Sequence, residues 1–332
     1  MKVVDGVTVL VYKEGSAHDV NDGELHIRFS DDYGQTWSAE DEYLDTTAIT
    51  GFPMNPSTLS GGEDAGEPWL YLADNGDLIL HMWRVDYGVS RGGTWQSVSS
   101  NGGLSWSTSS QVDFSGISGD DYILATDDDF VLSGTIYAAA RIHADATPSN
   151  SYCVLIKSED DGASWSYVSD ITASGSLTHE VGLEYLGNNT IIAIIRSLNN
   201  SKTYRRYSTD LGATWETLED ISTAIQVSGR HRIYTLSHLK EESNWWNDQT
   251  LIMVGFVNGT IGLSTPRRNC IWISLDGGNL WTSPMYIDSQ YEDGGYGDVI
   301  YDPNNNEFVV VSYVGSLGEA NLKQYNISVG GL

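Results

Sequence analysis

The chain has 332 residues, of which 40% are hydrophobic and 11% aromatic, so it can bury a large core, and this composition argues against disorder. Its 45 acidic residues far outnumber its 17 basic residues, and the formal net charge is -28. A surface of this charge disfavours nucleic acid and anionic membranes as partners, because both bind basic patches. Any cluster of arginines in a cleft would run against this overall charge and would therefore be informative.

Short β-rich apolar runs, bounded by Gly, Asn and Asp, follow one another along the whole chain, while helical periodicity is almost absent. Each run has the length of a strand, and the intervening turn residues predict hairpins. The predicted strands, in chain order, are 7–12, 25–30, 78–83, 135–142, 152–158, 190–196, 250–256, 270–274 and 307–314.

One short motif recurs five times: Ser, any residue, Asp or Asn, any residue, Gly, any residue, a small or apolar residue, Trp. Its acid or amide can accept backbone N–H groups across a turn, and its glycine allows a positive φ. The tryptophan can pack over the turn. These roles predict a structural rather than catalytic use for Asp32, Asn101, Asp160, Asp210 and Asp276. The copies are SDDYGQTW at 30–37, SSNGGLSW at 99–106, SEDDGASW at 158–165, STDLGATW at 208–215 and SLDGGNLW at 274–281.

The spacing of the motifs fixes the expected architecture. Their tryptophans are 69, 59, 50 and 66 residues apart, which is the length of one supersecondary module. Short strands with one aromatic-glycine motif per module predict an all-β, six-bladed β-propeller of four-stranded antiparallel blades, with seven blades as the alternative. We expect a single domain over residues 1–332, with strands from both termini closing the ring and leaving no exposed sheet edge.

Other features predict little chemistry of their own. Cys153 and Cys270 lie in apolar runs and are expected to be buried free thiols, and no cofactor or metal is expected. The acidic run 127–129 lacks the spacing of a calcium loop and predicts a solvated loop. The N-terminal sequence MKVVDGVTVL has no signal-peptide layout, which is typical of a mature fragment or a segment of a larger protein.

The five motifs in register resemble the Asp boxes (BNR repeats) of the sialidase and neuraminidase superfamily, and the resemblance covers nearly the whole chain. It implies a retaining, exo-acting glycoside hydrolase on an acidic sugar, with divergent and non-sialidase members included. In this family a tyrosine is the nucleophile, because a carboxylate would be repelled by the carboxylate of the substrate. A glutamate activates the tyrosine, an aspartate is the acid/base, and arginines bind the substrate carboxylate through a planar fork.

Three segments resemble those that carry the family's functional residues. THEVGLEYLGNNTIIAIIRS nominates Glu180 as the activating glutamate and Arg196 as a carboxylate-binding arginine. PRRNCIWISLDGGNLW nominates Arg268, with Arg267 as the alternative, because only one of two adjacent strand residues can point toward the centre. DGGYGDVIYD nominates Tyr296 as the nucleophile.

The front end of the chain matches the family less closely. In VYKEGSAHDVNDGELHIRFS, Lys13 takes the place of a supporting arginine and Asp19 that of the acid/base, with His18 and Asp22 as competitors in the same loop. The family's first arginine lies upstream of this segment, in a region that the chain lacks, so sialic acid specificity is not implied. The cations that remain as electrostatic substitutes are Lys13, Arg28 and Arg84.

Two rival functions compete with the hydrolase, which we favour. A propeller polysaccharide lyase on uronic acid polymers would use a tyrosine or a histidine (His18, His81 or His143) as a base near a carboxylate neutralised by arginine. Arg141, at the end of a predicted inner strand, could reach the central cleft and bind substrate. A glycan-binding propeller without catalysis, for example in a phage fibre or an adhesin, needs no catalytic group. All three functions imply a glycan or polysaccharide partner and an extracellular or virion-surface location, with assembly into a larger chain or virion also open.

Overall fold

The protein is an all-β, six-bladed β-propeller of small sheets with almost no helix, as expected from the repeats. The computed structural model describes residues 1–15, 23–44, 47–53, 64–86, 90–117, 122–125, 127–143, 151–240, 249–257, 267–287, 293–316 and 319–328. Every predicted apolar strand is present. Among the described residues the single helix is α1 (Leu236–Leu239). It is too short to cross a membrane.

The first three sheets contain the strands up to residue 170. The third is not purely antiparallel, because β13 pairs with the short strand β8 in parallel through Trp165 and Phe114. In order of pairing, the sheets are β1 (Lys2–Val4), β2 (Val7–Glu14) and β3 (Glu24–Ser30); β4 (Asp64–Leu72), β5 (Leu78–Asp86), β6 (Ser90–Ser99) and β7 (Ser110–Gln111); and β10 (Asp129–Leu132), β11 (Thr135–His143), β12 (Ser151–Ser158), β13 (Trp165–Asp170) and β8 (Phe114–Ser115), with β9 (Tyr122–Leu124) paired to β11.

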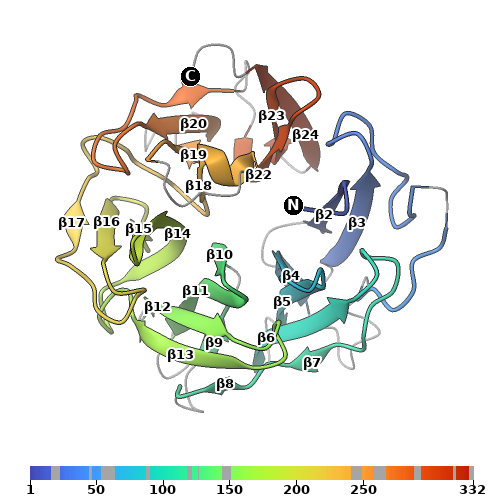
Figure 1. Ribbon diagram of the computed structural model, residues 1–332, viewed down its shortest axis with the longest axis horizontal. Coiled ribbons are helices and arrows are strands. Elements are labelled where there is room, and N and C mark those ends of the chain that lie inside the picture. Colours follow the sequence, from blue (N-terminus) through green and yellow to red (C-terminus); the bar gives the residue numbers. More distant parts are fainter. Residues whose placement is uncertain are drawn as a thin grey trace. The chain divides into compact units, whose positions relative to one another are not determined.

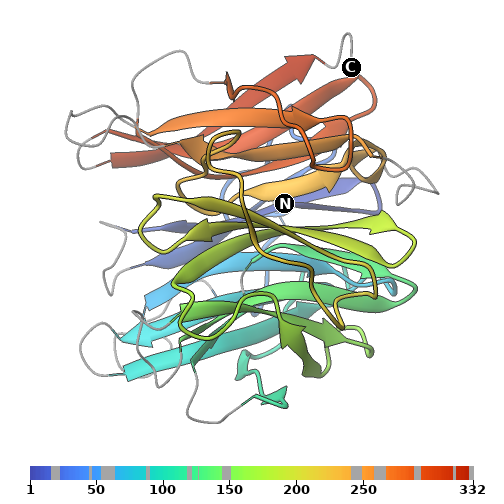
Figure 2. The same ribbon diagram turned by 90° about the vertical axis from the view of Figure 1, so that its left-hand side faces the viewer.

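The last three sheets are antiparallel and follow one another in chain order (Figure 1). Their first strands, β14, β18 and β22, bring the three sheets into contact with one another. Figure 2 shows the same sheets from the side, coloured from green through yellow to red. The sheets are β14 (Thr178–Gly187), β15 (Thr190–Ser197), β16 (Thr203–Ser208) and β17 (Glu219–Asp220); β18 (Arg232–Thr235), β19 (Leu251–Val257), β20 (Arg268–Ser274) and β21 (Met285–Tyr286); and β22 (Asp293–Asp302), β23 (Glu307–Ser316) and β24 (Glu319–Ser328).

The number of strands per sheet varies around the predicted four. Three sheets have four strands, whereas the sheets nearest the two termini have three strands each, and each of these two is built from one end of the chain. Outer strands β7, β17 and β21, which follow the Asp boxes at 99–106, 208–215 and 274–281, are only two residues long.

The chain divides into two compact units. The N-terminal unit comprises Met1–Thr126, Val131–Tyr137 and Ile156–Tyr167, and the C-terminal unit comprises Asp127–Phe130, Ala138–Leu155 and Val168–Leu332. Each has an apolar core between neighbouring sheets. In the C-terminal unit, one cluster surrounds Trp272 and Met253, and a second surrounds Val310 and Phe308.

The Asp boxes form the predicted turns. In the box at 208–215, Asp210 Oδ1 accepts the backbone N–H of Thr214 at 2.8 Å, and Ser208 Oγ accepts that of Gly212 at 2.8 Å. Gly212 has φ +83°, and Leu211 before it has φ +55°, so two successive residues are left-handed. The same bonds to the aspartate or asparagine recur in the other four boxes. The box aspartates therefore act within the turns.

Two predictions about buried groups have different outcomes. Cys153 and Cys270 are buried free thiols, as expected, and burial raises the pKa of Cys153 to about 12. The solvated loop predicted for residues 127–129 is wrong, because Asp127, Asp128 and Asp129 are at most 1% exposed. Arginines compensate the buried charge of this run, which sequence alone does not reveal.

Candidate functional site

A tyrosine and a glutamate from two sheets of the C-terminal unit form the centre of the candidate site. Tyr296 Oη, on β22, donates a hydrogen bond to Glu180 Oε1, on β14, at 3.1 Å. Glu180 is fully buried, and Tyr296 is partly exposed. The other carboxylate oxygen of Glu180 accepts a hydrogen bond from Arg196 Nε, at the end of β15. One buried carboxylate is thus oriented by a cation on one side and faces a phenol on the other.

The guanidinium of Arg196 is extensively bonded within the protein. Besides Glu180, it donates to Nδ1 of His179 at 2.7 Å, to the carbonyl of Ser197 at 3.2 Å and to the side chain of Asn200. An arginine has five N–H donors in a fixed fork. Most of the N–H donors of Arg196 therefore orient the side chains of Glu180 and His179 and stabilise the turn after β15.

His179 lies between two arginines beside the Tyr296–Glu180 pair. Its Nδ1 accepts from Arg196, and Arg141 Nη1 lies 3.2 Å from both ring nitrogens. Nδ1 is also 3.5 Å from Glu180 Oε2, and His143 follows at 6.1 Å between ring centroids. Because a guanidinium can only donate, Nδ1 of His179 is the acceptor of the hydrogen bond from Arg196.

One further guanidinium lies near the ring of Tyr296, and another lies near two rings that contact Tyr296. Arg230 Cζ is 5.3 Å from the centroid of this ring. Arg267 Cζ is 5.3 Å from the ring of Phe256 and 5.7 Å from that of Tyr313, and these two rings contact Tyr296 with centroids at 5.8 and 6.2 Å. Cations over aromatic faces are favourable, and here two of them lie over the ring of Tyr296 and its aromatic neighbours in a chain of net charge -28.

The buried acidic run at 127–129 pairs with arginines in and beside the site. Asp127 Oδ1 lies 3.6 Å from Arg141 Nε and 3.8 Å from Arg230 Nε. Next to it, Asp128 Oδ1 lies 3.2 Å from Arg232 Nε, and Asp129 Oδ1 lies 3.8 Å from Arg232 Nη1. The three consecutive carboxylates thus pair with three arginines of the C-terminal unit.

Asp128 also connects separate strands through backbone bonds. Its Oδ2 accepts the N–H of Leu183, on β14, at 3.2 Å and that of Ile233, on β18, at 3.0 Å. Burial raises the pKa of Asp128 to about 7, although the neighbouring Arg232 opposes the shift. Arg232 in turn donates to Tyr234, whose Oη donates to Asp298 at 3.1 Å.

His231, between Arg230 and Arg232, is a structural residue. Its ring nitrogens lie 3.1 Å from the carbonyl of Gly229 and 2.9 Å from that of Ile194. Burial lowers the pKa of His231 to about 4, so the imidazole is neutral at physiological pH. It fixes the segment before β18 against β15.

The five boxes and the propeller architecture place the chain among known proteins. The family model described as a BNR repeat-like domain matches residues 8–309. The chain belongs to this family. The resemblance of the five boxes to the Asp-box superfamily is thereby confirmed. No curated protein sequence matches the chain.

Similar solved structures give this BNR chain the fold of sialidases. A Hadza microbial sialidase, Hz136, has a TM-score of 0.75 at 17% identity, covering 98% of this chain and 64% of that one. Trypanosoma rangeli sialidase in complex with 2,3-difluorosialic acid has a TM-score of 0.72 at 15% identity, covering 98% and 53%. A protein of unknown function from Dyadobacter fermentans has a TM-score of 0.72 at 15% identity, covering 98% and 92%. The BNR chain therefore spans less than two thirds of the length of these two sialidases, and the likeness shows the fold.

Three residues nominated from the sequence lie together in the BNR propeller. Glu180, Arg196 and Tyr296 are joined by hydrogen bonds, and Arg141 reaches them through His179. Of the two adjacent candidates, Arg267 is the one near the aromatic neighbours of Tyr296.

Arg268 and the front-end candidates have other positions. Arg268 Cζ stacks over the ring of Tyr286, on β21, at 3.9 Å. Lys13 belongs to the N-terminal unit, where it is paired with Leu25 in the register of β2 and β3. Asp19 and His18, like Asp22, lie outside the described residues, so the predicted acid/base remains a prediction.

The remaining candidates of the N-terminal unit are held by structural contacts. His81 is fully buried, and its ring nitrogens lie 3.0 Å from the carbonyl of Ala125 and 2.8 Å from Gln96 Oε1. Arg84 stacks over Trp95 at 3.8 Å, and Arg28 donates to Tyr12 Oη at 3.1 Å.

His179 and Arg230 are the site residues that sequence reasoning missed. His179 directly precedes Glu180 in the segment that resembles the family, so its position was a usable signal. Arg230 begins the short RHR sequence at 230–232, which is a concentration of positive charge in a chain with only 17 basic residues. Neither lies in an Asp box, where the repeated pattern is found.

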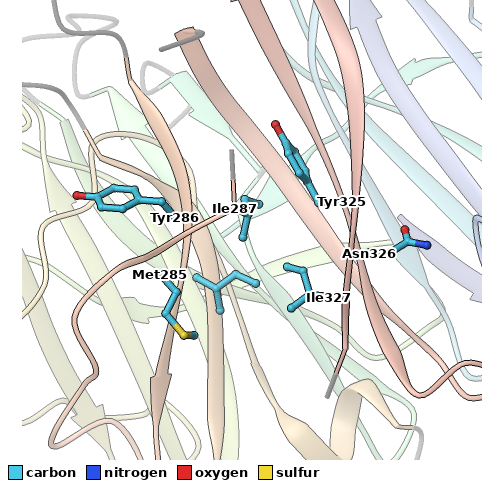
Figure 3. Close-up of a pocket in the computed structure, with 7 residues that line it drawn as sticks. Met285, Tyr286, Ile287, Tyr325, Asn326 and Ile327 are labelled. Carbon is cyan, nitrogen blue, oxygen red and sulfur yellow. The ribbon is translucent and has the colours of Figure 1, made fainter. Parts of the chain in front are cut away.

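Two other features could bind ligands but lack the chemistry of the central cluster. In the described part of the N-terminal unit, Glu14, His26 and Glu40 place ligand atoms within 4.8 Å of one another, as a metal site would require. In the C-terminal unit, a groove of about 330 Å³ lies between β20–β21 and β24 (Figure 3). Its lining is mainly apolar, with the residues Ile271, Met285, Tyr286, Ile287, Tyr325, Asn326 and Ile327.

Proposed function

We propose that the chain is a retaining, sialidase-like exo-glycoside hydrolase that acts on an acidic sugar of a glycan or polysaccharide. The observation that carries the proposal is the hydrogen bond of 3.1 Å from Tyr296 Oη to the buried carboxylate of Glu180. A phenol next to a carboxylate base is the pairing that an uncharged nucleophile needs. The arginines around Tyr296 match an anionic substrate in an otherwise acidic protein.

The reaction would proceed through a covalent intermediate. Tyr296 Oη attacks the anomeric carbon as its proton passes to Glu180, and the bond from that carbon to the leaving oxygen breaks. The leaving oxygen takes a proton from an acid, the role predicted for Asp19. Water then attacks the anomeric carbon, and the deprotonated form of that acid accepts a proton from this water. The bond from the anomeric carbon to Tyr296 Oη breaks, and the phenol regains its proton from Glu180.

The Tyr296→Phe variant tests this mechanism. It keeps the aromatic packing but removes the nucleophile, so we expect kcat on a fluorogenic glycoside of an acidic sugar to fall by about 10³-fold or more. Tyr286→Phe, a tyrosine of outer strand β21 that is 49% exposed, is the matched control and should retain activity. Turnover by Tyr296→Phe at the wild-type rate would refute the assignment.

A lyase acting on uronic acid polymers is the second candidate. It is favoured by His179, an imidazole with Arg141 and Arg196 at hydrogen-bond distance, because a base beside cations suits abstraction of a proton next to a neutralised carboxylate. A lyase forms an unsaturated sugar that absorbs in the ultraviolet, whereas a hydrolase forms a reducing end without this absorbance. Binding to a glycan array without either product would instead support a binding module at the cell exterior or on a virion.

A further inference from the structure

A histidine of the N-terminal unit lies on the first sheet, on the face that is turned away from the apolar core (β2 and β3 in Figure 1). Leu25 and Ile27 of β3 are buried in that core. Because successive side chains of a strand point to opposite faces, Glu24 and His26 lie on the other face of the sheet. The side chain of His26 is nevertheless only 12% exposed, so polar neighbours rather than the core enclose its imidazole.

Each ring nitrogen of His26 faces two carboxylates. Nδ1 lies 2.9 Å from Asp41 Oδ2 and 3.6 Å from Glu40 Oε1. Nε2 lies 3.8 Å from Glu14 Oε2 and 4.0 Å from Glu24 Oε2. A neutral imidazole has a single N–H donor. In either tautomer, one nitrogen therefore presents its lone pair to two carboxylates, which is the donor arrangement around a bound metal ion.

The segment after the first Asp box fixes Asp41 against the histidine. Asp41 donates its backbone N–H to the carbonyl of Ile27 at 2.9 Å, and its Oδ1 accepts the N–H of Ile27 at 3.1 Å. Its other oxygen, Oδ2, is directed at His26 Nδ1. Histidines that bind metals usually donate their second ring N–H to a carboxylate or carbonyl, which orients the ring. Asp41 has the position of that carboxylate, and Nε2 is then the nitrogen that faces a cation.

Glu40 is oriented from its far side. Its Oε2 accepts hydrogen bonds from Tyr12 Oη and from Arg28 Nη2, while Oε1 faces the imidazole of His26. The ligand atoms of Glu14, His26 and Glu40 lie within 4.8 Å of one another. Three side chains that can reach one ion thus come from β2, from β3 and from the segment after the box.

Two glutamates are directly opposite each other where the β2–β3 pairing ends. Glu14 is the partner of Glu24 in the register of these strands. Like charges at such positions are destabilising, and a divalent cation beside them would convert the repulsion into attraction. Because Zn–N and Zn–O bonds are about 2.0–2.2 Å long, two ligands of a tetrahedral zinc ion are roughly 3.4 Å apart. A small movement of the Glu14 side chain, which is 67% exposed, would close the 3.8 Å between its Oε2 and His26 Nε2.

We propose that Glu14, His26 and Glu40 bind a divalent transition-metal cation of the zinc class. An imidazole among carboxylates suits such an ion, whereas calcium and magnesium prefer oxygen ligands alone. The first sheet has three strands, and residues 38–41 lie beside β3, on the side where three other sheets have a short fourth strand. The ion would join this segment to β2 and β3, so its role is structural. The proposal concerns the N-terminal unit and does not depend on the proposed function.

Titration of the chelator-treated full chain with Zn2+ in a calorimeter tests the proposal. His26→Gln should weaken zinc binding by about 30-fold or more, and Glu14→Gln by about tenfold or more, because each removes a ligand. Asp31→Asn is the matched control: it removes an exposed acid that follows the opposite end of β3, and it should bind zinc as the wild type does. Mg2+ at the same concentration should not compete.

Zinc should also raise the midpoint of thermal unfolding of the wild type by more than that of Glu14→Gln, because an ion that binds the folded state stabilises it. Equal zinc affinity of the wild type and both variants, or no zinc binding by the wild type, would overturn the proposal. Loss of binding in Glu14→Gln but not in His26→Gln would also overturn it, because the site would then consist of oxygen ligands alone. Since Glu14 is exposed, its variant keeps the test valid even if His26→Gln fails to fold, which circular dichroism detects.

Discussion

Aspartates serve opposite purposes in the Asp boxes and in the acidic run at 127–129. The box aspartates are at turns, where their carboxylates accept N–H and O–H groups within the same few residues, as Asp32 does from Thr36. Asp127, Asp128 and Asp129 are buried and face arginines distant in the sequence. The repeated acids thus organise the chain locally, and the unrepeated ones organise the candidate site.

Removal of Asp128 should have the largest effect on stability. Asp128→Ala leaves the buried Arg232 without its nearest carboxylate and two backbone N–H groups without an acceptor. We expect the free energy of unfolding to fall by about 3 kcal/mol or more in urea titration. Asp128→Asn, which retains an acceptor for the backbone groups, should lose less, and a loss below about 1 kcal/mol for Asp128→Ala would show that the carboxylate is not structural.

The glycine of a box should matter less than Asp128 but more than the box acid. Gly162 has φ +82°, and a Cβ there would lie 2.4 Å from Ile79 Cδ1, so Gly162→Ala should cost about 2 kcal/mol. Gly102 is the matched control, because its φ of +68° is also left-handed but no atom lies within 4 Å of the position that a Cβ would occupy. Gly102→Ala should cost about 1 kcal/mol, and equal losses in thermal unfolding would exclude the steric explanation.

The smallest expected effects are on the pH dependence of stability, which should distinguish the two kinds of aspartate. Burial raises the folded-state pKa of Asp128 from 3.8 to about 7, so between these pH values the folded protein binds a proton that the unfolded protein does not. Protonation of Asp128 therefore stabilises the folded state at low pH, and this contribution is lost as the pH rises from about 4 to 7. Bonds from Thr36 lower the pKa of Asp32 despite partial burial, so its contribution is lost as pH falls below 3.8.

Asn substitutions test these signs. The free energy of unfolding is measured by urea titration from pH 3 to 8. In Asp128→Asn its decline toward neutral pH should disappear. In Asp32→Asn its decline in acid should disappear, which is a change of about 1 kcal/mol at most. The same slope in both variants would contradict the contrast between the two regions.

The sequence was most informative where a pattern repeats. The boxes mark each turn through local bonds and left-handed glycines, so the propeller could be predicted, and the family resemblance then located Glu180, Arg196 and Tyr296. Arg230 and the burial of Asp128 could not be predicted, because both depend on partners far along the chain. An acidic run is usually solvated, and only the arginines that fold against it show that this one is buried.

The two backbone bonds of Asp128 have a consequence for unfolding. Its carboxylate joins the amides of Leu183 and Ile233, and its own backbone pairs with Val181 and Ala139, so one residue links β11, β14 and β18. Opening of the segment that carries Asp128 leaves amides on all three of these strands without their native partners. Hydrogen exchange at Leu183 and Ile233 should therefore require opening of the C-terminal unit as a whole, which makes it one cooperative unit rather than a series of independently opening blades.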